Sequence, residues 1–236
     1  MSKKNKRNKE STEIILGEST DTATLIFSHG LGDSPTSWIF FANEIKRFVK
    51  NIRVILLSAP NNPVSVNNGL EMPSWFDILE IPITMEALDN GKYMDESINI
   101  IHKMIDSEIE KGISPNRIFV GGFSQGATLS LIATLKYTKE KLGGVAMLSG
   151  WIFKNHNLSK LAKGINNNIP VFIGHGDKDK VVLYENAKNS ESILKACKFS
   201  DITFKTYNNM GHNSSTKEID DLIFWINKLN NSNSNS

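Results

Sequence analysis

Short apolar runs alternate with longer amphipathic stretches along most of this chain. The apolar runs have the length of buried strands and lie at residues 23–28, 54–58, 118–121, 145–148, 171–174 and 203–207. Helical patterns separate them, and the clearest lie at residues 37–49, 95–111 and 215–229. In the second of these, isoleucines recur at helical spacing, which marks the buried face of an amphipathic helix. This alternation predicts an α/β fold, with a mostly parallel central sheet and helices on both faces.

The two ends of the chain differ from the part between them. Residues 1–12 are rich in lysine, and residues 230–236 contain only asparagine and serine. Such segments bury no core, so we expect disordered tails at 1–12 and 230–236 around one domain at 13–229. The chain has 236 residues, of which 39% are hydrophobic, and this is enough for one domain with a substantial core.

Positive charge is concentrated at the start of the chain. The formal net charge is +2, but five basic residues against Glu10 give the first ten residues +4, so the other 226 residues carry −2. A body that is not basic gives little support to nucleic-acid binding. The basic start is either a solvated tail without a role or a segment that is weakly attracted to anionic lipid. The attraction would contribute about 1 kcal/mol per basic residue close to the membrane surface. Transient contact with a membrane surface therefore stays open, as does the oligomeric state.

The single cysteine, Cys197, excludes a disulfide framework and is compatible with a reducing compartment. No run approaches ~18 apolar residues, and the first ten residues lack the apolar region of a signal peptide. We therefore expect a cytoplasmic protein.

The most informative motif is Gly122-Phe123-Ser124-Gln125-Gly126. G-x-S-x-G is the pattern of a sharp strand-to-helix turn that holds out a serine as a nucleophile, with glycines where a Cβ would clash with the neighbouring strand and helix. The motif alone is weak, but an apolar strand precedes it and a stretch of small and apolar residues, 126–135, follows it. We therefore predict that Ser124 is a catalytic nucleophile.

A serine hydroxyl needs a base, and the base needs an orienting carboxylate. With an elbow of this type the carboxylate and then the histidine follow the serine along the chain. Three histidines lie downstream, and we predict His212 as the base because it follows Gly211 in a polar turn that can reach over the elbow. His175 ends an apolar strand, so we expect a structural hydrogen-bonding role for it. His156 is expected at the surface.

Two aspartates follow the apolar strand that ends near His175. We predict Asp179 as the acid because Val181 and Val182 can hold its loop against the core. Asp177 lies in the turn itself and is expected to cap or shape it.

Acyl transfer also needs N–H donors aimed at the developing oxyanion. Gln125, the residue after the nucleophile, supplies one backbone N–H. We expect Leu31 to supply the other, because the strand at 23–28 runs into the glycine-flanked turn His29-Gly30-Leu31-Gly32-Asp33. The sequence therefore predicts an oxyanion hole made by the backbone of Leu31 and Gln125.

Taken together, these segments resemble the acyl-protein thioesterases and their lysophospholipase and carboxylesterase relatives. The matching segments, from about residue 14 to about residue 229, are His29–Asp33, Ala59-Pro60, Met72–Asp77, Asp95–Ser97, Asn116–Ile118, Gly121–Gly126, His175-Gly176 with Asp179, Phe204–Tyr207, and His212. The resemblance implies an α/β-hydrolase fold that works without a cofactor or a metal ion. It places the nucleophile on Ser124, the acid on Asp179 and the base on His212, in agreement with the prediction from the residues themselves.

The resemblance implies a serine hydrolase that removes palmitoyl-type groups from S-acylated protein cysteines. A thiolate of pKa near ~8.5 leaves with less acid help than an alkoxide, so the same triad can cleave thioesters and oxygen esters. A lysophospholipase or small-ester carboxylesterase, acting on acyl lipids or simple esters, is therefore the alternative. A non-catalytic lipid-binding or adaptor domain is a third interpretation, but it would not require all three triad residues.

Residues 59–77 combine three prolines with apolar side chains, and the resemblance implies that this stretch helps to line an acyl channel. The candidate substrate-binding residues are Leu70, Met72, Trp75 and Phe76, with Trp151 as a further wall. Core packing is the alternative for some of them. The chain departs from the family in two places, since residues 81–93 match no motif and Lys180 stands where many relatives carry proline. A missing proline predicts a less rigid acid loop.

Overall fold

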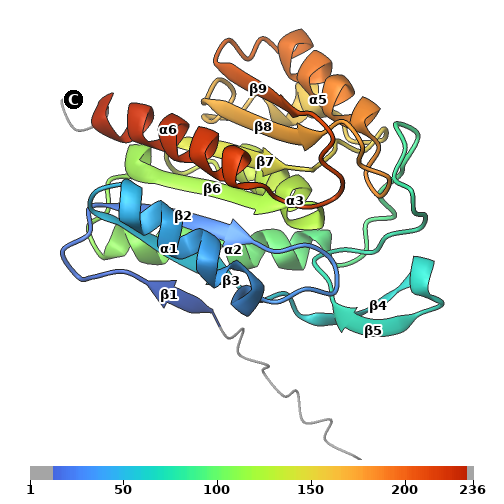
Figure 1. Cartoon of the computed structure of the whole chain (residues 1–236), viewed down its shortest axis with the longest axis horizontal. Coiled ribbons are helices and arrows are strands. Elements are labelled where there is room, and N and C mark those ends of the chain that lie inside the picture. Colours follow the sequence, from blue (N-terminus) through green and yellow to red (C-terminus); the bar gives the residue numbers. More distant parts are fainter. Residues whose placement is uncertain (1–12, 233–236) are drawn as a thin grey trace, which may run out of the picture.

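A seven-stranded sheet forms the centre of the structure, a computed structural model that describes residues 13–232 (Figure 1). The predicted tail at 1–12 and the last four residues lie outside the described range. In spatial order the strands are β1 (Ile14–Leu16), β3 (Ile52–Leu57), β2 (Ala23–Ser28), β6 (Ile118–Phe123), β7 (Gly144–Leu148), β8 (Val171–Gly176) and β9 (Ile202–Tyr207). Only β1 runs antiparallel to its neighbour within the described sheet, so the prediction of a mostly parallel sheet is confirmed.

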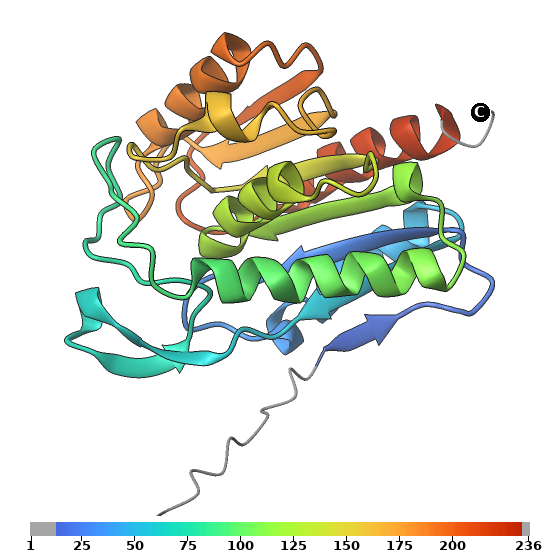
Figure 2. The same ribbon diagram turned by 180° about the vertical axis from the view of Figure 1, so that it is seen from behind.

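Helices cover both faces of the sheet. Figure 1 views the face covered by α1 (Ile39–Phe48) and α6 (Thr216–Ser232). Figure 2 shows the opposite face, with α2 (Met94–Glu110), α3 (Gln125–Lys136), the short α4 (Leu158–Leu161) and α5 (Tyr184–Ala196). Successive strand residues point to opposite faces, so Leu25 and Phe27 join the core under α1 and α6, while Ile26 joins the core on the other side.

The central helix is α3, which follows the G-x-S-x-G motif. Every residue from Gln125 to Leu135 is buried, because α3 packs against β6, β7 and β2 and lies beside α2 and α4 on the same face of the sheet. A helix enclosed in this way needs small and apolar residues on all its faces, which is what the sequence of this stretch provides. The start of α3, and with it Ser124, is therefore fixed at the end of the central strand, β6.

Some elements differ from the sequence-based expectation. The short edge strand β1 and the hairpin of β4 (Asn61–Val64) and β5 (Leu70–Pro73) were not predicted. A C-terminal tail was expected from residue 230, but α6 continues to Ser232 and Asn230 is buried, so residues 230–232 belong to the helix. Two side-chain amides attach the end of α6 to the end of α1: Asn227 donates to the Phe48 carbonyl at 2.9 Å and Asn230 to the Lys50 carbonyl at 3.4 Å.

The loops that follow β2, β6, β8 and β9 all leave the same edge of the sheet, on the right in Figure 1. Ligands of open parallel sheets bind at this carboxyl edge of the strands. The β4–β5 hairpin and the extended segment 78–93 lie at the same edge (Figures 1 and 2). This arrangement brings together residues that are far apart in the sequence.

The carboxyl group of Glu218 in α6 is completely buried. Burial, together with the nearby Asp221 carboxylate, raises its pKa from 4.5 to about 8. Between pH 4.5 and about 8 the folded protein therefore keeps a proton that the unfolded chain releases. The free energy of unfolding is highest below pH 4.5 as far as this group is concerned, and it falls as the pH rises towards 8.

We expect Glu218→Gln, which cannot ionise, to melt at a higher temperature than the wild type, with a difference that grows between about pH 5 and about pH 8. The measurement is thermal unfolding across this range, with Glu185→Gln on the exposed face of α5 as the control. A difference that stays constant with pH would show that Glu218 ionises alike in the folded and unfolded states.

Candidate active site

Ser124 lies at the tip of a tight turn between β6 and α3. Its backbone has φ 55° and ψ −119°, a conformation that side-chain-bearing residues rarely adopt. Gly122 and Gly126 make the turn possible: a Cβ on Gly122 would overlap the backbone of Gly126, and a Cβ on Gly126 would overlap the Ser28 carbonyl oxygen. The predicted elbow, and the predicted reason for its glycines, are both confirmed.

Three side chains from three different loops form a hydrogen-bonded chain. The Ser124 Oγ lies 2.9 Å from His212 Nε2, and His212 Nδ1 lies 2.7 Å from Asp179 Oδ2. A carboxylate only accepts, so Nδ1 carries the proton and Nε2 is free to accept from the serine hydroxyl. The three residues selected from the sequence are therefore brought together in the arrangement that activates a serine.

The Asp179 carboxylate is held on both of its oxygens. Its Oδ1 accepts the backbone N–H groups of Val181 and Val182 at 2.8 and 2.9 Å, and its Oδ2 accepts His212 Nδ1–H. Burial acts to raise the pKa of this carboxyl group, but the N–H groups of His175, His212 and Val181 outweigh burial and hold the pKa well below its usual range. Asp179 is therefore ionised and can stabilise a positive charge on His212.

The other candidates take different positions. Asp177 Oδ1 accepts the Asn209 N–H at 2.7 Å, which is the turn-shaping role expected for it. His175 is fully buried, and its Nε2 lies 2.9 Å from the Val182 carbonyl oxygen. His156 was expected at the surface, but its side chain is mostly buried and its Nε2 pairs with Asp89 at 2.8 Å. The expectation for His156 is wrong because segment 78–93, whose position the sequence did not reveal, supplies this partner.

The backbone N–H groups of Leu31 and Gln125 both lie beside the elbow. Within residues 13–232, neither group donates a hydrogen bond to another protein atom. The turn that carries Leu31 is fixed by His29, whose Nδ1–H donates to the Gly30 carbonyl at 2.7 Å and whose Nε2 accepts the Ala59 N–H at 3.1 Å. Burial lowers the pKa of His29, which keeps its ring neutral and suits this pattern of one donor and one acceptor.

The side chain of Gln125 fixes a second segment to the elbow. Its Oε1 accepts the Trp75 N–H at 2.9 Å, and its Nε2 donates to the Phe76 carbonyl at 2.6 Å. Trp75 in turn donates its Nε1–H to the His29 carbonyl at 2.8 Å. Segment 74–76 is thus a buried support that ties the nucleophile turn to the turn after β2.

An apolar cavity of about 250 Å³ opens beside Ser124. Besides Ser124 and His212, its lining includes Leu31, Phe123 and Trp151 together with a set of aliphatic side chains, namely Ile78, Ile81, Ile83, Val181 and Val182. Trp151 therefore lies where the sequence predicted a wall. A lining of aliphatic side chains suits a hydrocarbon chain.

Four expected wall residues do not line this cavity. Leu70 is 63% exposed on the β4–β5 hairpin, and Met72 packs with its sulfur beside Gly32. Trp75 and Phe76 are completely buried, and Phe76 supports the wall from behind with its ring edge-on to Trp151 at 5.9 Å. Core packing, the open alternative, therefore describes Trp75 and Phe76, whereas Leu70 lies at the surface outside this cavity.

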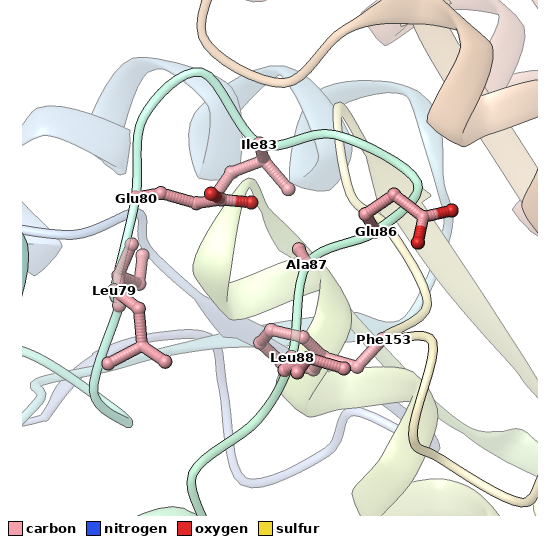
Figure 3. Close-up of a pocket in the computed structure, with 8 residues that line it drawn as sticks. Leu79, Glu80, Ile83, Glu86, Ala87, Leu88 and Phe153 are labelled. Atoms are coloured by element: carbon pink, nitrogen blue, oxygen red, sulfur yellow. The ribbon is translucent and has the colours of Figure 1, made fainter.

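A second, smaller cavity of about 130 Å³ adjoins the first and shares Ile78 and Ile83 with it. In Figure 3, Glu80 and Ile83 lie along one side of this cavity, and Leu88 and Phe153 lie along the other. Segment 78–88 supplies most of the lining of the smaller cavity and contributes Ile78, Ile81 and Ile83 to the larger one, although the sequence offered no motif for it. The apolar residues at positions 78, 79, 81, 83, 85 and 88 were the only available signal.

Segment 78–88 is attached directly to the loop that carries Asp179. Ile83 donates its N–H to the Val181 carbonyl at 2.7 Å, and its own carbonyl accepts the Leu183 N–H at 3.2 Å and the Asn186 side chain at 2.7 Å. The wall of the cavity and the acid of the triad are thus parts of one hydrogen-bonded unit.

Within the described range, no helix is both long and apolar enough to cross a bilayer. The same range contains no cluster of three His, Cys, Asp or Glu side chains placed to hold a metal ion.

Comparison with known proteins agrees with this geometry. Residues 9–230 match the family model described as phospholipase/carboxylesterase. The chain is 38% identical over 222 residues to acyl-protein thioesterase 1 of Cryptococcus neoformans, covering 87% of this chain and 91% of the relative. Among solved structures, Arabidopsis thaliana SOBER1 has a TM-score of 0.79 at 32% identity, covering 88% of this chain and 98% of SOBER1. Zea mays acyl-protein thioesterase 2 has a TM-score of 0.77 at 28% identity, covering 93% of this chain and 99% of the maize protein. The chain therefore belongs to the phospholipase/carboxylesterase family of α/β-hydrolases.

Proposed function

We propose that this chain is an acyl-protein thioesterase, a serine hydrolase that removes long acyl groups from S-acylated cysteines of proteins. The observation that carries the proposal is the hydrogen-bonded chain from Ser124 through His212 to Asp179. Ser124 and His212 line an aliphatic cavity that can take the acyl group. The relatives named acyl-protein thioesterase, in Cryptococcus neoformans and other fungi, support the choice of substrate.

The proposed reaction has two acyl-transfer steps. Ser124 Oγ attacks the thioester carbonyl while His212 Nε2 takes the hydroxyl proton, and Asp179 stabilises the resulting imidazolium. The backbone N–H groups of Leu31 and Gln125 hold the oxyanion of the tetrahedral intermediate. Collapse of this intermediate expels the cysteine thiolate, which takes the proton from His212. Water, deprotonated by His212, then attacks the acyl-enzyme, releases the fatty acid and restores Ser124.

The first prediction from the proposed reaction concerns the triad. Ser124→Ala should lower kcat at least ~10³-fold while the fold persists, because nucleophile and base act as a unit and the oxyanion hole and binding alone remain. Asp179→Asn should also be severe, since an amide cannot hold His212 in the required tautomer.

Asp177→Asn is the matched control two residues away, and it should be mild because Asp177 contacts Asn209 instead of His212. Steady-state rates on a soluble thioester, with melting curves for each variant, decide the assignment. The reverse ranking of the two aspartates would contradict it.

The second prediction concerns acyl length. If the aliphatic cavity takes the acyl chain, each methylene that it buries contributes up to ~0.8 kcal/mol, so kcat/KM should rise from acetyl to medium-length thioesters before it levels off. Ile81 lines this cavity and is itself 45% exposed, so a charge there is compatible with folding. Ile81→Asp should lower kcat/KM for long chains far more than for acetyl, since only a long chain forces the charge to lose water.

Leu70→Asp makes the same substitution at a leucine that is 63% exposed and outside the cavity, and it should leave the length profile unchanged. The measurement is kcat/KM for matched acyl thioesters, lysophospholipids and short oxygen esters on the wild type and both variants. A preference of the wild type for lysophospholipids or short esters over thioesters would replace the proposed substrate. A change in the length profile with Leu70→Asp, but not with Ile81→Asp, would place the acyl chain on the hairpin instead.

A further inference from the structure

The buried His175 lies against the acid of the triad. It is the penultimate residue of β8, its side chain is completely buried, and its Nε2 lies 3.3 Å from Asp179 Oδ2. This oxygen is the one that accepts His212 Nδ1–H at 2.7 Å. Two imidazole rings therefore face the same carboxylate oxygen, one from the strand beneath it and one from the loop above the nucleophile.

The partners of His175 fix its tautomer. Its Nε2 lies 2.9 Å from the Val182 carbonyl oxygen, which can only accept, so Nε2 carries the proton. Its Nδ1 is buried and has no hydrogen-bond partner within residues 13–232. A second proton on this ring would bury an unpaired N–H and a charge, so the ring is neutral. Its Nε2, bonded to the Val182 carbonyl, lies 3.3 Å from Asp179 Oδ2 and does not cancel the charge of the carboxylate.

The two oxygens of Asp179 are not equally well fixed. Two backbone N–H groups hold Oδ1, whereas Oδ2 faces the two histidines. His212 is on a surface loop with its side chain 17% exposed, and it must change protonation in every cycle. His175 is completely enclosed and carries a proton that the cycle does not use. Of the two histidines, His175 is thus the one with a constant position and charge.

We propose that His175 is a positioning residue that acts through Asp179: its Nε2–H lies between the Val182 carbonyl and Asp179 Oδ2 and keeps this oxygen directed at His212. The inference rests on the roles proposed above for Ser124, His212 and Asp179. The sequence predicted a structural role for His175, and the proposal adds that this role supports catalysis. A neutral donor suits this place, because a cation would compete with the His212 imidazolium for the same carboxylate.

The test compares three substitutions of His175. The amide nitrogen of Gln stands as many bonds from Cβ as Nε2 of histidine does, so His175→Gln keeps an N–H near Asp179. His175→Phe fills similar space without a donor, and His175→Asn folds into less space with an amide that is too short to reach. A displaced acid should misplace the base, and a misplacement of about 1 Å can cost ~10²-fold.

We expect His175→Phe and His175→Asn to lower kcat for a soluble thioester about 10- to 100-fold, with KM changed less than about threefold. His175→Gln should retain kcat within about threefold of the wild type. The control is His102→Phe, because the Nε2 of His102 also bonds a backbone carbonyl, that of Ala133 at 2.8 Å, but between α2 and α3. This control should leave both constants unchanged.

Equal kcat for the wild type and His175→Phe would overturn the inference. So would an equal fall in all three variants that follows their melting temperatures, because that pattern belongs to packing alone. The wild type and Asp179→Asn are measured beside them. An inactive wild type, or an active Asp179→Asn, would overturn the proposed function and this inference with it. An inactive Asp179→Asn with an unaffected His175→Phe would overturn this inference only.

Discussion

The close approach of α3 to the end of β2 is the constraint on which the rest of the site depends. A Cβ at Gly126 would overlap the carbonyl oxygens of Ser28 and His29, so the helix can start where it does only with glycine at this position. This contact fixes the positions of two residues at once. Ser124 lies two residues before Gly126, and Leu31 lies two residues after His29. The nucleophile and the turn expected to form the oxyanion hole are therefore positioned by one piece of packing and not by two independent loops.

Around this contact, buried polar groups convert separate loops into one body. Gln125 and Trp75 join the elbow to the turn after β2, and Ser97 Oγ donates to the Trp75 carbonyl at 2.5 Å from α2. On the other side, Ile83 joins the cavity wall to the loop of Asp179. Each of these bonds is made in the interior, where an unmade bond is costly, so each loop has a single favoured position. A rigid site of this kind keeps Ser124 and His212 aligned.

The sequence predicted the chemistry better than the shape of the site. The elbow, and the meeting of Ser124 with His212 and Asp179, could be predicted because strand ends, turn glycines and chain order can be read from the sequence. The cavity wall could not be predicted from the sequence. The way in which the β4–β5 hairpin folds back decides whether Leu70 or Trp75 faces the cavity. Segment 78–88 was missed for the same reason: its isoleucines become a wall only when Ile83 pairs with the acid loop, a contact across about a hundred residues. The continuation of α6 to Ser232 was missed because asparagine-rich sequence suggests a tail, whereas Asn227 and Asn230 donate their amides to the carbonyls of Phe48 and Lys50.

The proposed roles of His212, Asp179 and the cavity all require Ser124 to be an activated nucleophile. The most direct measurement is the reaction of the folded protein with a fluorophosphonate, followed by mass spectrometry of its peptides. We predict one adduct, on the peptide that contains Ser124, and none in Ser124→Ala or when His212 is replaced by Gln. A folded wild-type protein that forms no adduct, or that forms it on another residue, would contradict the account.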